Sequence, residues 1–353
     1  QSWRTGRLRM VLQAGWATHG LAHATDHPAN HPYVRLAVAM SEAAVDGVCR
    51  LMLGTHGAWQ ALIPWIEQLM EESLGKGGKG AVVFADTPLN ANGRCYRADG
   101  MMRAHIGSGG SPDDPALVVV PVGPITDSAS TLSSVAAAFL GWQLSMALYG
   151  YLHDIQFAGQ PAVEDYKARA RALRTERDPV QIASGWGTIL RDGSLSLLSS
   201  PDRDTAQSSA ELIAAALRSD CPSYLDLTVN GEPSAESLTE VERSLEYLGN
   251  TVLGIPVKLR RAPAAYHSTE QSEMDGPPGL VSIRILASDH ESALLGRYDA
   301  TFLAAQAVGT WQAMVEAGRS CYLMVVDGTL IAGLPVIAEL LADIAARITH
   351  ADE

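Results

Sequence analysis

Short runs of apolar, often β-branched residues alternate with helix-like segments through the first half of the chain, and this alternation limits the folds open to it. Three runs have turn residues on both sides and the length of buried strands: CRLMLGT (49–55), AVVFAD (81–86) and LVVVPVG (117–123). Such continuous apolar runs are typical of parallel strands covered on both faces. A weaker strand, MMRAHIG (101–107), lies between the last two.

Segments with helical periodicity separate these runs. They are VRLAVAMSEAAVDGV (34–48), AWQALIPWIEQLMEESLG (58–75), SVAAAFLGWQLSMALYGYLHD (134–154) and AVEDYKARARAL (162–173). In the second of them we expect a kink at Pro64 and an end at Gly75. Alternating helices and strands favour a doubly wound parallel sheet, so we predict an α/β domain over residues 34–174.

The second half of the chain repeats strands and helices in a different order. A polar segment rich in Ser, Asp and Arg (175–222) reads as a connector, and residues 1–33 read as irregular. Beyond the connector the order is β-α-β-β-α-β, followed by the amphipathic helix LPVIAELLADIAARI. This order is typical of a split βαβ unit. We therefore predict a smaller α+β domain with a terminal helix over residues 223–353.

Charge, cysteine use and hydropathy bear on the class of partner. The formal net charge is -13, which disfavours nucleic acid because no basic surplus neutralises phosphates. We find no apolar run of the roughly 18–20 residues that a membrane span needs, and no basic-then-apolar leader. No CxxC pair occurs, which suits free thiols in a reducing compartment. We expect a soluble cytoplasmic protein with four free cysteines: Cys49, Cys95, Cys221 and Cys321.

Two motifs suggest chemistry that their context disfavours, and a third, that of serine hydrolases, is absent from the sequence. GKGGKG (75–80) lies between a helix and a strand in the wrong order for a phosphate loop, and no Ser or Thr follows either lysine. No GxSxG nucleophile elbow occurs. A zinc site is disfavoured because prolines interrupt the one histidine series at four-residue steps: His19, His23, His27 and His31. We predict neither a metal nor a cofactor.

The segment IEQLMEESLGKGGKG (66–80) poses a question that the fold alone does not answer. Two adjacent acids, Glu71 and Glu72, end the helix. Acids are unfavourable there because the helix C-terminus carries partial negative charge. Either this helix end is solvated or an acid is needed at this position.

Two stretches together resemble the phosphoglucose isomerase family. WIEQLMEESLGKGGKG (65–80) resembles its signature of a helix with Gln and Glu before a Ser-x-Gly-Lys turn, and QFAGQPAVEDYK (156–167) resembles its Phe-Asp-Gln-Pro-x-Val-Glu-x-x-Lys segment. The apolar helix between them also resembles the family. In the C-terminal half, AAYHSTEQSEMDGPPGL (264–280) is similar to the His-Ser-Thr-Gly-Gln stretch of transaldolase–phosphoglucose isomerase fusion proteins.

The resemblance implies a sugar isomerase (SIS) fold and isomerisation of a sugar phosphate, of the glucose 6-phosphate to fructose 6-phosphate type. Such a reaction passes one proton between adjacent carbons through an enediol and needs one well-placed carboxylate. By similarity Glu72 is that base, with Lys167 and His267 assisting ring opening or oxygen charge. The implied substrate-binding residues are Gln68, Ser73, Gly75, Lys76 and Gln160.

Departures from the family leave three readings open. No first SIS domain, which supplies the family's phosphate pocket, precedes the Glu72 motif. Ala158 and Gly159 replace the family's usual Asp-containing run, while Glu270 and Met274 stand where Gly and Lys are expected. The chain is then the C-terminal part of an isomerase whose phosphate site comes from a partner chain or preceding domain. Alternatively it is a sugar-phosphate-binding regulatory subunit, or an assembly component. Self-association is also left open.

Overall fold

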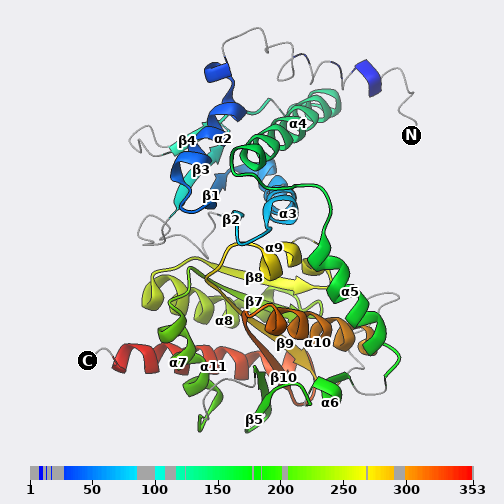
Figure 1. Cartoon of the computed structure of the whole chain (residues 1–353), viewed down its shortest axis with the longest axis vertical. Helices are drawn as coiled ribbons and strands as arrows, with labels where there is room; N and C mark the ends of the chain where they lie inside the picture. The colour runs from blue at the N-terminus through cyan, green and yellow to red at the C-terminus, as the bar shows by residue number, and fades with distance from the viewer. Residues whose placement is uncertain are drawn as a thin grey trace. The chain divides into compact units, whose positions relative to one another are not determined.

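The computed structural model describes residues 8–10, 13, 17, 28–85, 100–107, 117–123, 125–176, 179–183, 185–200, 206–267, 269–289 and 299–351. The chain divides into two compact units, which we call unit 1 (described residues up to Gly159) and unit 2 (Gln160 onward), and each is described by itself (Figure 1). The expected irregular segment 1–33 lies largely outside the described residues.

Unit 1 is built on a parallel sheet with the strand order β2-β1-β3-β4. All four strands fall where the apolar runs predicted them, and the α/β class is confirmed. The helices that connect them overlap the expected segments. The elements are α2 (Pro32–Ala43), β1 (Val48–Thr55), η3 (Gly57–Leu62), α3 (Ile63–Leu74), β2 (Gly80–Ala85), β3 (Met101–Ile106), β4 (Leu117–Val120) and α4 (Ser128–Leu152).

The core of unit 1 joins α2 and α4 across one face of this sheet. Tyr33 and Trp142 are both fully buried and meet edge to face with ring centroids 6.1 Å apart. Gly141 makes this contact possible, because a Cβ there would lie 2.1 Å from the Tyr33 ring. The Ser145 hydroxyl donates to the Tyr33 carbonyl at 2.7 Å, which ties the two helices further.

Helix α4 departs from one expectation. The sequence was expected to contain no run long and apolar enough to cross a membrane, but by length and hydropathy Ser128–Leu152 is such a helix among the described residues. Of its most apolar window, 39% is buried inside the structure. Its N-terminus is closed by a capping box, in which the Asp127 carboxylate accepts from the backbone of Ala129 and Ser130.

Unit 2 contains a six-stranded sheet with the order β5-β6-β10-β9-β7-β8. Strands β8, β7, β9 and β10 are mutually parallel, and β6 pairs antiparallel with both β5 and β10. Its strands are β5 (Thr188–Asp192), β6 (Leu195–Ser199), β7 (Tyr224–Asn230), β8 (Val257–Ala262), β9 (Leu280–Ala287) and β10 (Ser320–Val326). Its helices are α5 (Pro161–Leu173), α6 (Pro179–Ala183), α7 (Ser209–Asp220), α8 (Ala235–Glu246), η6 (Tyr247–Leu253), η7 (Ala264–His267), α9 (Glu270–Asp275), α10 (Ala300–Glu316) and α11 (Leu330–Ala351).

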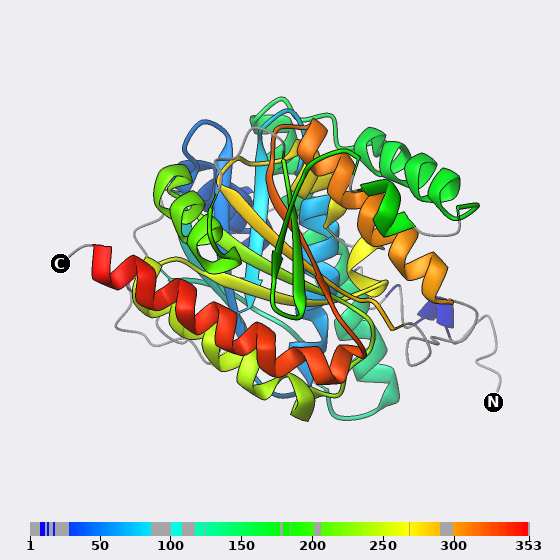
Figure 2. The same ribbon diagram turned by 90° about the horizontal axis from the view of Figure 1, so that it is seen from below.

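The parallel pairing corrects the split βαβ arrangement expected for this half. The chain between β8 and β9 passes through η7 and α9, so β9 re-enters the sheet in the same direction as β8, on the other side of β7. A crossover of this length permits parallel strands, whereas a tight hairpin would have made the two strands antiparallel. Helices α7, α8 and α11 cover one face, and α5 and α10 cover the other (Figure 2).

The division between the units also differs from the expected boundary after residue 174. Helix α5 packs along α10 of unit 2, where Gly309 lies so close that a Cβ on it would be 3.0 Å from the Ala170 backbone nitrogen. The polar segment 175–222, expected to be a connector, supplies α6, β5, β6 and α7. Its leucines Leu195 and Leu197 are buried in the core of unit 2, although a serine separates them in the sequence.

Candidate active site

Helix α3 presents the acidic end that the sequence singled out. Pro64 lies in its first turn, after the 3₁₀ turn η3, so the proline begins the helix rather than kinking it. The helix ends at Leu74 with Gly75 as C-cap. Apolar side chains such as Ile66 and Met70 are fully buried and fix this helix against the sheet.

The two adjacent acids at this end have different environments. Glu71 is fully buried, and its Oε1 accepts a hydrogen bond of 2.9 Å from the backbone N–H of Val83 in β2. Strand β2 is at the edge of the sheet, so this carboxylate satisfies an N–H that no neighbouring strand reaches. Glu71 is therefore held by the fold and is withdrawn from solvent.

Glu72 is half-buried and pairs with an amide one turn earlier. Successive residues differ by about 100° around a helix, so Glu72 cannot share the environment of Glu71. The Gln68 Nε2 donates to Glu72 Oε2 at 3.1 Å. A carboxylate and an amide on one accessible helix face form a pair that can accept a proton from a carbon acid and hydrogen-bond its hydroxyl.

The GKGGKG loop is a two-residue hairpin. Lys76 and Lys79 exchange backbone hydrogen bonds of 3.1 Å in both directions, and Gly77 and Gly78 both have positive φ (60° and 77°). Positive φ at both central residues is characteristic of a type I′ turn, which explains the paired glycines. Ser73 and Gly75 precede this turn, Ser73 half-buried in the last turn of α3 and Gly75 buried at its C-cap.

The lysines of the hairpin contact the C-cap of α4 and the segment that follows it. The Nζ of Lys76 donates to the Gln156 carbonyl and that of Lys79 to the His153 carbonyl, both at 2.9 Å. Lys79 is favourable beside His153 because the last carbonyls of a helix carry partial negative charge. Near them the Nε2 of His153 lies 2.9 Å from the Ser41 hydroxyl, and burial, with Lys79 nearby, lowers the pKa of His153.

The three remaining predicted residues belong to unit 2, on elements that the fold brings together. Gln160 precedes α5 without capping it by its side chain, and the Gln271 side chain of α9 instead accepts from the Ala162 N–H at 3.1 Å. Lys167 forms an ion pair with Glu164 at 3.5 Å on the surface of α5. His267 is the last residue of η7.

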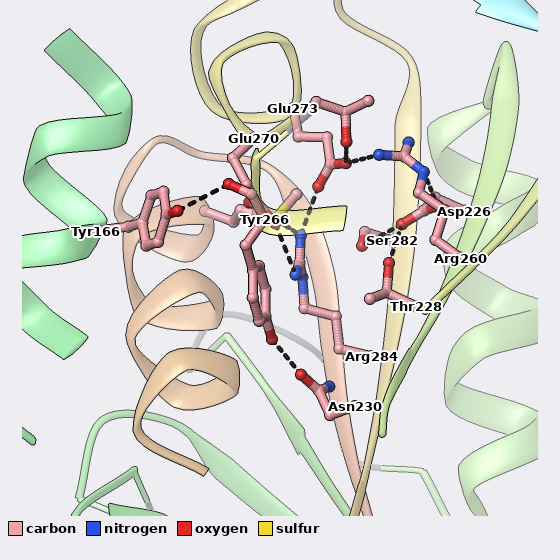
Figure 3. A network of polar contacts seen from close by, with 12 residues as sticks. Tyr166, Asp226, Thr228, Asn230, Arg260, Tyr266, Glu270, Glu273, Ser282 and Arg284 are labelled. Carbon is pink, nitrogen blue, oxygen red and sulfur yellow. Dashed lines mark hydrogen bonds and ion pairs between the residues drawn. The ribbon is translucent and has the colours of Figure 1, made fainter. Parts of the chain in front are cut away.

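One hydrogen bond links the two motifs of unit 2 directly. The Tyr166 hydroxyl donates 2.8 Å to the backbone carbonyl of Tyr266, so the neighbour of Lys167 contacts the neighbour of His267. Both tyrosines are buried, and burial raises the pKa of each phenol well above its ordinary value. The Tyr266 hydroxyl in turn contacts the Asn230 side chain (Figure 3).

A buried ionic network anchors the segment that follows His267. Figure 3 shows the carboxylates of α9, Glu270 and Glu273, facing Arg284 of β9, with Glu273 also contacting Arg260 of β8. Asp226 of β7 completes it, with Oδ1 2.9 Å from Arg260 Nε. Because buried charges are costly unless paired, these contacts hold α9 in one position on the sheet.

The pKa values of the two glutamates of this network shift in opposite directions, although burial by itself would raise both. Burial, reinforced by the neighbouring Glu273, raises the pKa of Glu270 to about 8 even though Arg284 opposes the shift. The pKa of Glu273 is lowered instead, because Arg260 and Arg284 together outweigh the burial penalty. Glu270, which replaces the glycine of the family resemblance, is thus a partner of Arg284, and Met274 is buried on the same helix.

The eight predicted residues therefore fall into two groups. Gln68, Glu72, Ser73, Gly75 and Lys76 belong to unit 1, where they share one helix end and its turn, while Gln160, Lys167 and His267 belong to unit 2. Sequence reasoning missed the roles of Tyr166 and Tyr266, since a tyrosine hydroxyl bonded to a distant carbonyl leaves no pattern in the chain.

No group of three or more metal-ligating side chains occurs among the residues that the structure describes. Of the histidine series weighed for zinc, only His31 is described, and His19, His23 and His27 lie outside the described residues.

Comparison with known proteins gives structural likenesses alone. No protein-family model matches the chain, and no curated protein does. It is similar to a hypothetical protein from Thermus thermophilus at 12% identity and a TM-score of 0.32, over 97% of this chain and 85% of that one. It is similar to a glucose-6-phosphate isomerase from Chlamydia trachomatis at 13% identity and a TM-score of 0.30, over 95% and 72%.

A third likeness is to the C-terminal domain of a glucosamine-fructose-6-phosphate aminotransferase from Francisella tularensis, at 11% identity and a TM-score of 0.27, over 92% of this chain and 96% of that domain. Identities and TM-scores at this level do not assign the chain to a family.

Proposed function

We propose that the chain binds a sugar phosphate and interconverts its aldose and ketose forms by proton transfer through an enediol, with Glu72 as the base. The observation that carries this proposal is that the two adjacent acids at the end of α3 differ in burial and in hydrogen-bond partner. Glu71 is buried and bonded to Val83, whereas Glu72 is half-buried beside Gln68. The resemblance of this segment to the phosphoglucose isomerase signature supports the same residue.

The proton accounting requires one base that acts twice. The Glu72 carboxylate removes a proton from the carbon next to the carbonyl, and the C–H electron pair becomes the double bond of the enediol while a proton reaches the carbonyl oxygen. Return of the carboxyl proton to the other carbon, while the hydroxyl on the first carbon loses its proton and becomes the new carbonyl, completes the isomerisation. Gln68 hydrogen-bonds a substrate hydroxyl. The roles that the resemblance gives to residues of unit 2 stay predictions of the sequence: substrate binding for Gln160, and ring opening or the oxygen charge for Lys167 and His267.

The phosphate site is assigned to a part outside this chain's described elements. A partner chain or a preceding domain, or a second copy of the chain, supplies it under this proposal. The native mass of the purified material tests the point, and a complementary chain in stoichiometric amount or a defined oligomer is the expected result.

The central test follows deuterium exchange at C1 of fructose 6-phosphate in deuterated water by NMR. Exchange is expected for the wild-type chain with its partner, and Glu72→Gln should lower its rate by at least about 100-fold, the usual contribution of a general base. Glu67→Gln, on the same helix, is the matched control and should exchange at the wild-type rate. Unchanged exchange in Glu72→Gln would overturn the assignment of the base.

The alternative is a sugar-phosphate-binding subunit without turnover, in regulation or assembly. One observation favours it: Lys76 and Lys79 bind the carbonyls of Gln156 and His153, so the turn's cations are engaged within the fold. Binding of fructose 6-phosphate by calorimetry, without exchange in the presence of the partner, would select this alternative.

A further inference from the structure

A cavity of about 680 Å³ lies in unit 1, at the carboxyl edge of its sheet. Its lining includes His56 after β1, His105 and Gly107 at the end of β3, and Val119 of β4. Trp59 of η3 also lines it. The cavity is therefore formed where three parallel strands end.

The cavity lies beside the point where the strand order of the sheet reverses. In the order β2-β1-β3-β4, the chain leaves β1 toward β2 on one side and β3 toward β4 on the other. Ligands of open α/β sheets bind outside the carboxyl ends of the strands at this reversal. Glu72 lies near the end of α3, where the chain approaches the start of β2, at the opposite edge. The cavity is thus separate from the proposed base.

The lining is aromatic and apolar. The rings of His56 and His105 are 4.9 Å apart between centroids and tilted by 56°. Trp59 adds an indole, and the other described lining residues are aliphatic, proline or glycine. Among the described residues no Lys, Arg, Asp or Glu lines the cavity. Pockets of this kind recognise a flat apolar ligand and read its few polar edges with a small number of placed groups.

The nearest helix N-terminus does not provide an anion site. Helix α4 begins a few residues after the lining residue Ile125. Its first-turn N–H groups at Ala129 and Ser130 already donate to the Asp127 carboxylate, at 2.8 Å and 3.1 Å. These hydrogen bonds lower the pKa of Asp127, which therefore stays negative. A phosphate at this helix end would meet a carboxylate.

We propose that this cavity binds an uncharged planar nitrogen heterocycle of the nucleoside class, stacked on Trp59, with the exposed His56 imidazole at its polar edge. This site goes beyond the proposed isomerase and does not depend on it. The His56 imidazole can hydrogen-bond a polar edge atom of such a ring, whereas a bare sugar carries more hydroxyls than this lining can pair. A phosphorylated nucleotide gains nothing here, because no cation is among the described residues that line the cavity.

Adenosine is the probe, titrated into the full chain and followed by calorimetry, with AMP and glucose as comparators. We expect adenosine to bind, AMP to bind more weakly and glucose not to bind at millimolar concentration. Trp59→Ala should weaken adenosine binding by about fivefold to 100-fold, the range for one base stacked on one aromatic ring. Trp186→Ala, which removes an exposed indole of unit 2, is the matched control and should leave it unchanged.

His56→Ala is a second test of the site, because this exposed loop residue can be replaced without disturbing the core. It should also weaken adenosine binding, with circular dichroism unchanged. The proposal is overturned if adenosine does not bind, if its binding survives both Trp59→Ala and His56→Ala, or if AMP or glucose binds more tightly than adenosine.

Discussion

At the scale of single residues, the clearest result is that neighbours in the sequence have unrelated tasks. Glu71 satisfies the edge strand β2 and Glu72 faces Gln68, although the sequence presents them as an equivalent pair. Each acid at this unfavourable helix end therefore has its own explanation: Glu71 accepts from the backbone of Val83, and Glu72 is the proposed base. A similar separation holds for Glu270 and Glu273, whose pKa values shift in opposite directions.

The role of Glu71 leads to a stability prediction. In Glu71→Ala the buried N–H of Val83 loses its acceptor, so unit 1 should unfold with a free energy lower by about 1–3 kcal/mol. Urea unfolding followed by circular dichroism measures the change. Glu67→Ala on the same helix is the control, and an equal effect from both variants would show that the bond to Val83 is unimportant.

The raised pKa of Glu270 predicts a pH dependence of unit 2. The ordinary pKa of this side chain, 4.5, applies to the unfolded chain, while burial raises it to about 8 in the folded state. Between these values the folded state retains a proton that the unfolded state releases. Stability is therefore greatest below about pH 4.5 for this group, falls as pH rises and is lost through pH 8.

Replacing the acid isolates this contribution. Glu270→Gln keeps a neutral side chain at the same place, so its unfolding free energy should decline less between pH 5 and 8 than that of the wild type. Asp226, whose pKa burial also raises, maintains part of the slope. Glu242→Gln, an exposed change on α8, is the control. Parallel curves for wild type and Glu270→Gln would contradict the assignment.

At the scale of elements, the glycines after α3 are needed for two different reasons: some adopt a positive φ, and one allows a close approach of two backbone segments. Gly77 and Gly78 need positive φ but have open surroundings, whereas a Cβ at Gly80 would lie 2.6 Å from the Leu74 carbonyl oxygen. The backbone of β2 therefore passes directly under the end of α3. This close approach places Glu72 and the turn beside each other.

Two substitutions separate these effects. Gly80→Ala combines the clash with a φ of 134°, so it should destabilise unit 1 by more than about 1 kcal/mol. Gly77→Asn should be nearly neutral, because asparagine tolerates the left-handed conformation of a type I′ turn. Thermal unfolding measures the stability of both variants. A larger loss of stability from Gly77→Asn would show that the turn, and not the close approach of Gly80 to Leu74, is critical.

At the scale of the whole molecule, each unit has its own core. The unit 1 core runs from Tyr33 to Ile155 and that of unit 2 from Leu195 to Ile348, with no residue in common. Helix α5 belongs to unit 2 through its packing on α10. The sequence motif that carries Gln160 and Lys167 is thus part of unit 2, on the element next to η7.

A pair of fragments tests this division. The fragment 160–353 should fold cooperatively, because it contains the whole second core together with α5. The fragment 175–353 follows the boundary expected from the sequence and lacks α5, so it should be markedly less stable, leaving Gly309 and the apolar face of α10 exposed. Circular dichroism and urea unfolding measure both. Equal stability of the two fragments would show that α5 does not belong to this core.

The sequence by itself determined the elements and the class of fold, because hydrophobic periodicity and turn residues act over a few neighbouring positions. The strands of unit 1 and the long helix α4 fall where the pattern put them. The same local evidence failed for the hairpin of β5 and β6, where alternating serines and leucines looked like a connector although the leucines are buried.

Tertiary structure alone decided the direction of the strands, the environment of each candidate side chain and which residues come together. Whether β8 and β9 both run parallel to β7 depends on where the intervening chain returns, and no local pattern records this. The bond from Val83 to Glu71, the Tyr166–Tyr266 bond and the cavity lined by His56 and His105 all join residues that are separated in the chain. Burial and pairing arise only when such segments meet, which is why composition and spacing could name candidate residues but not their surroundings.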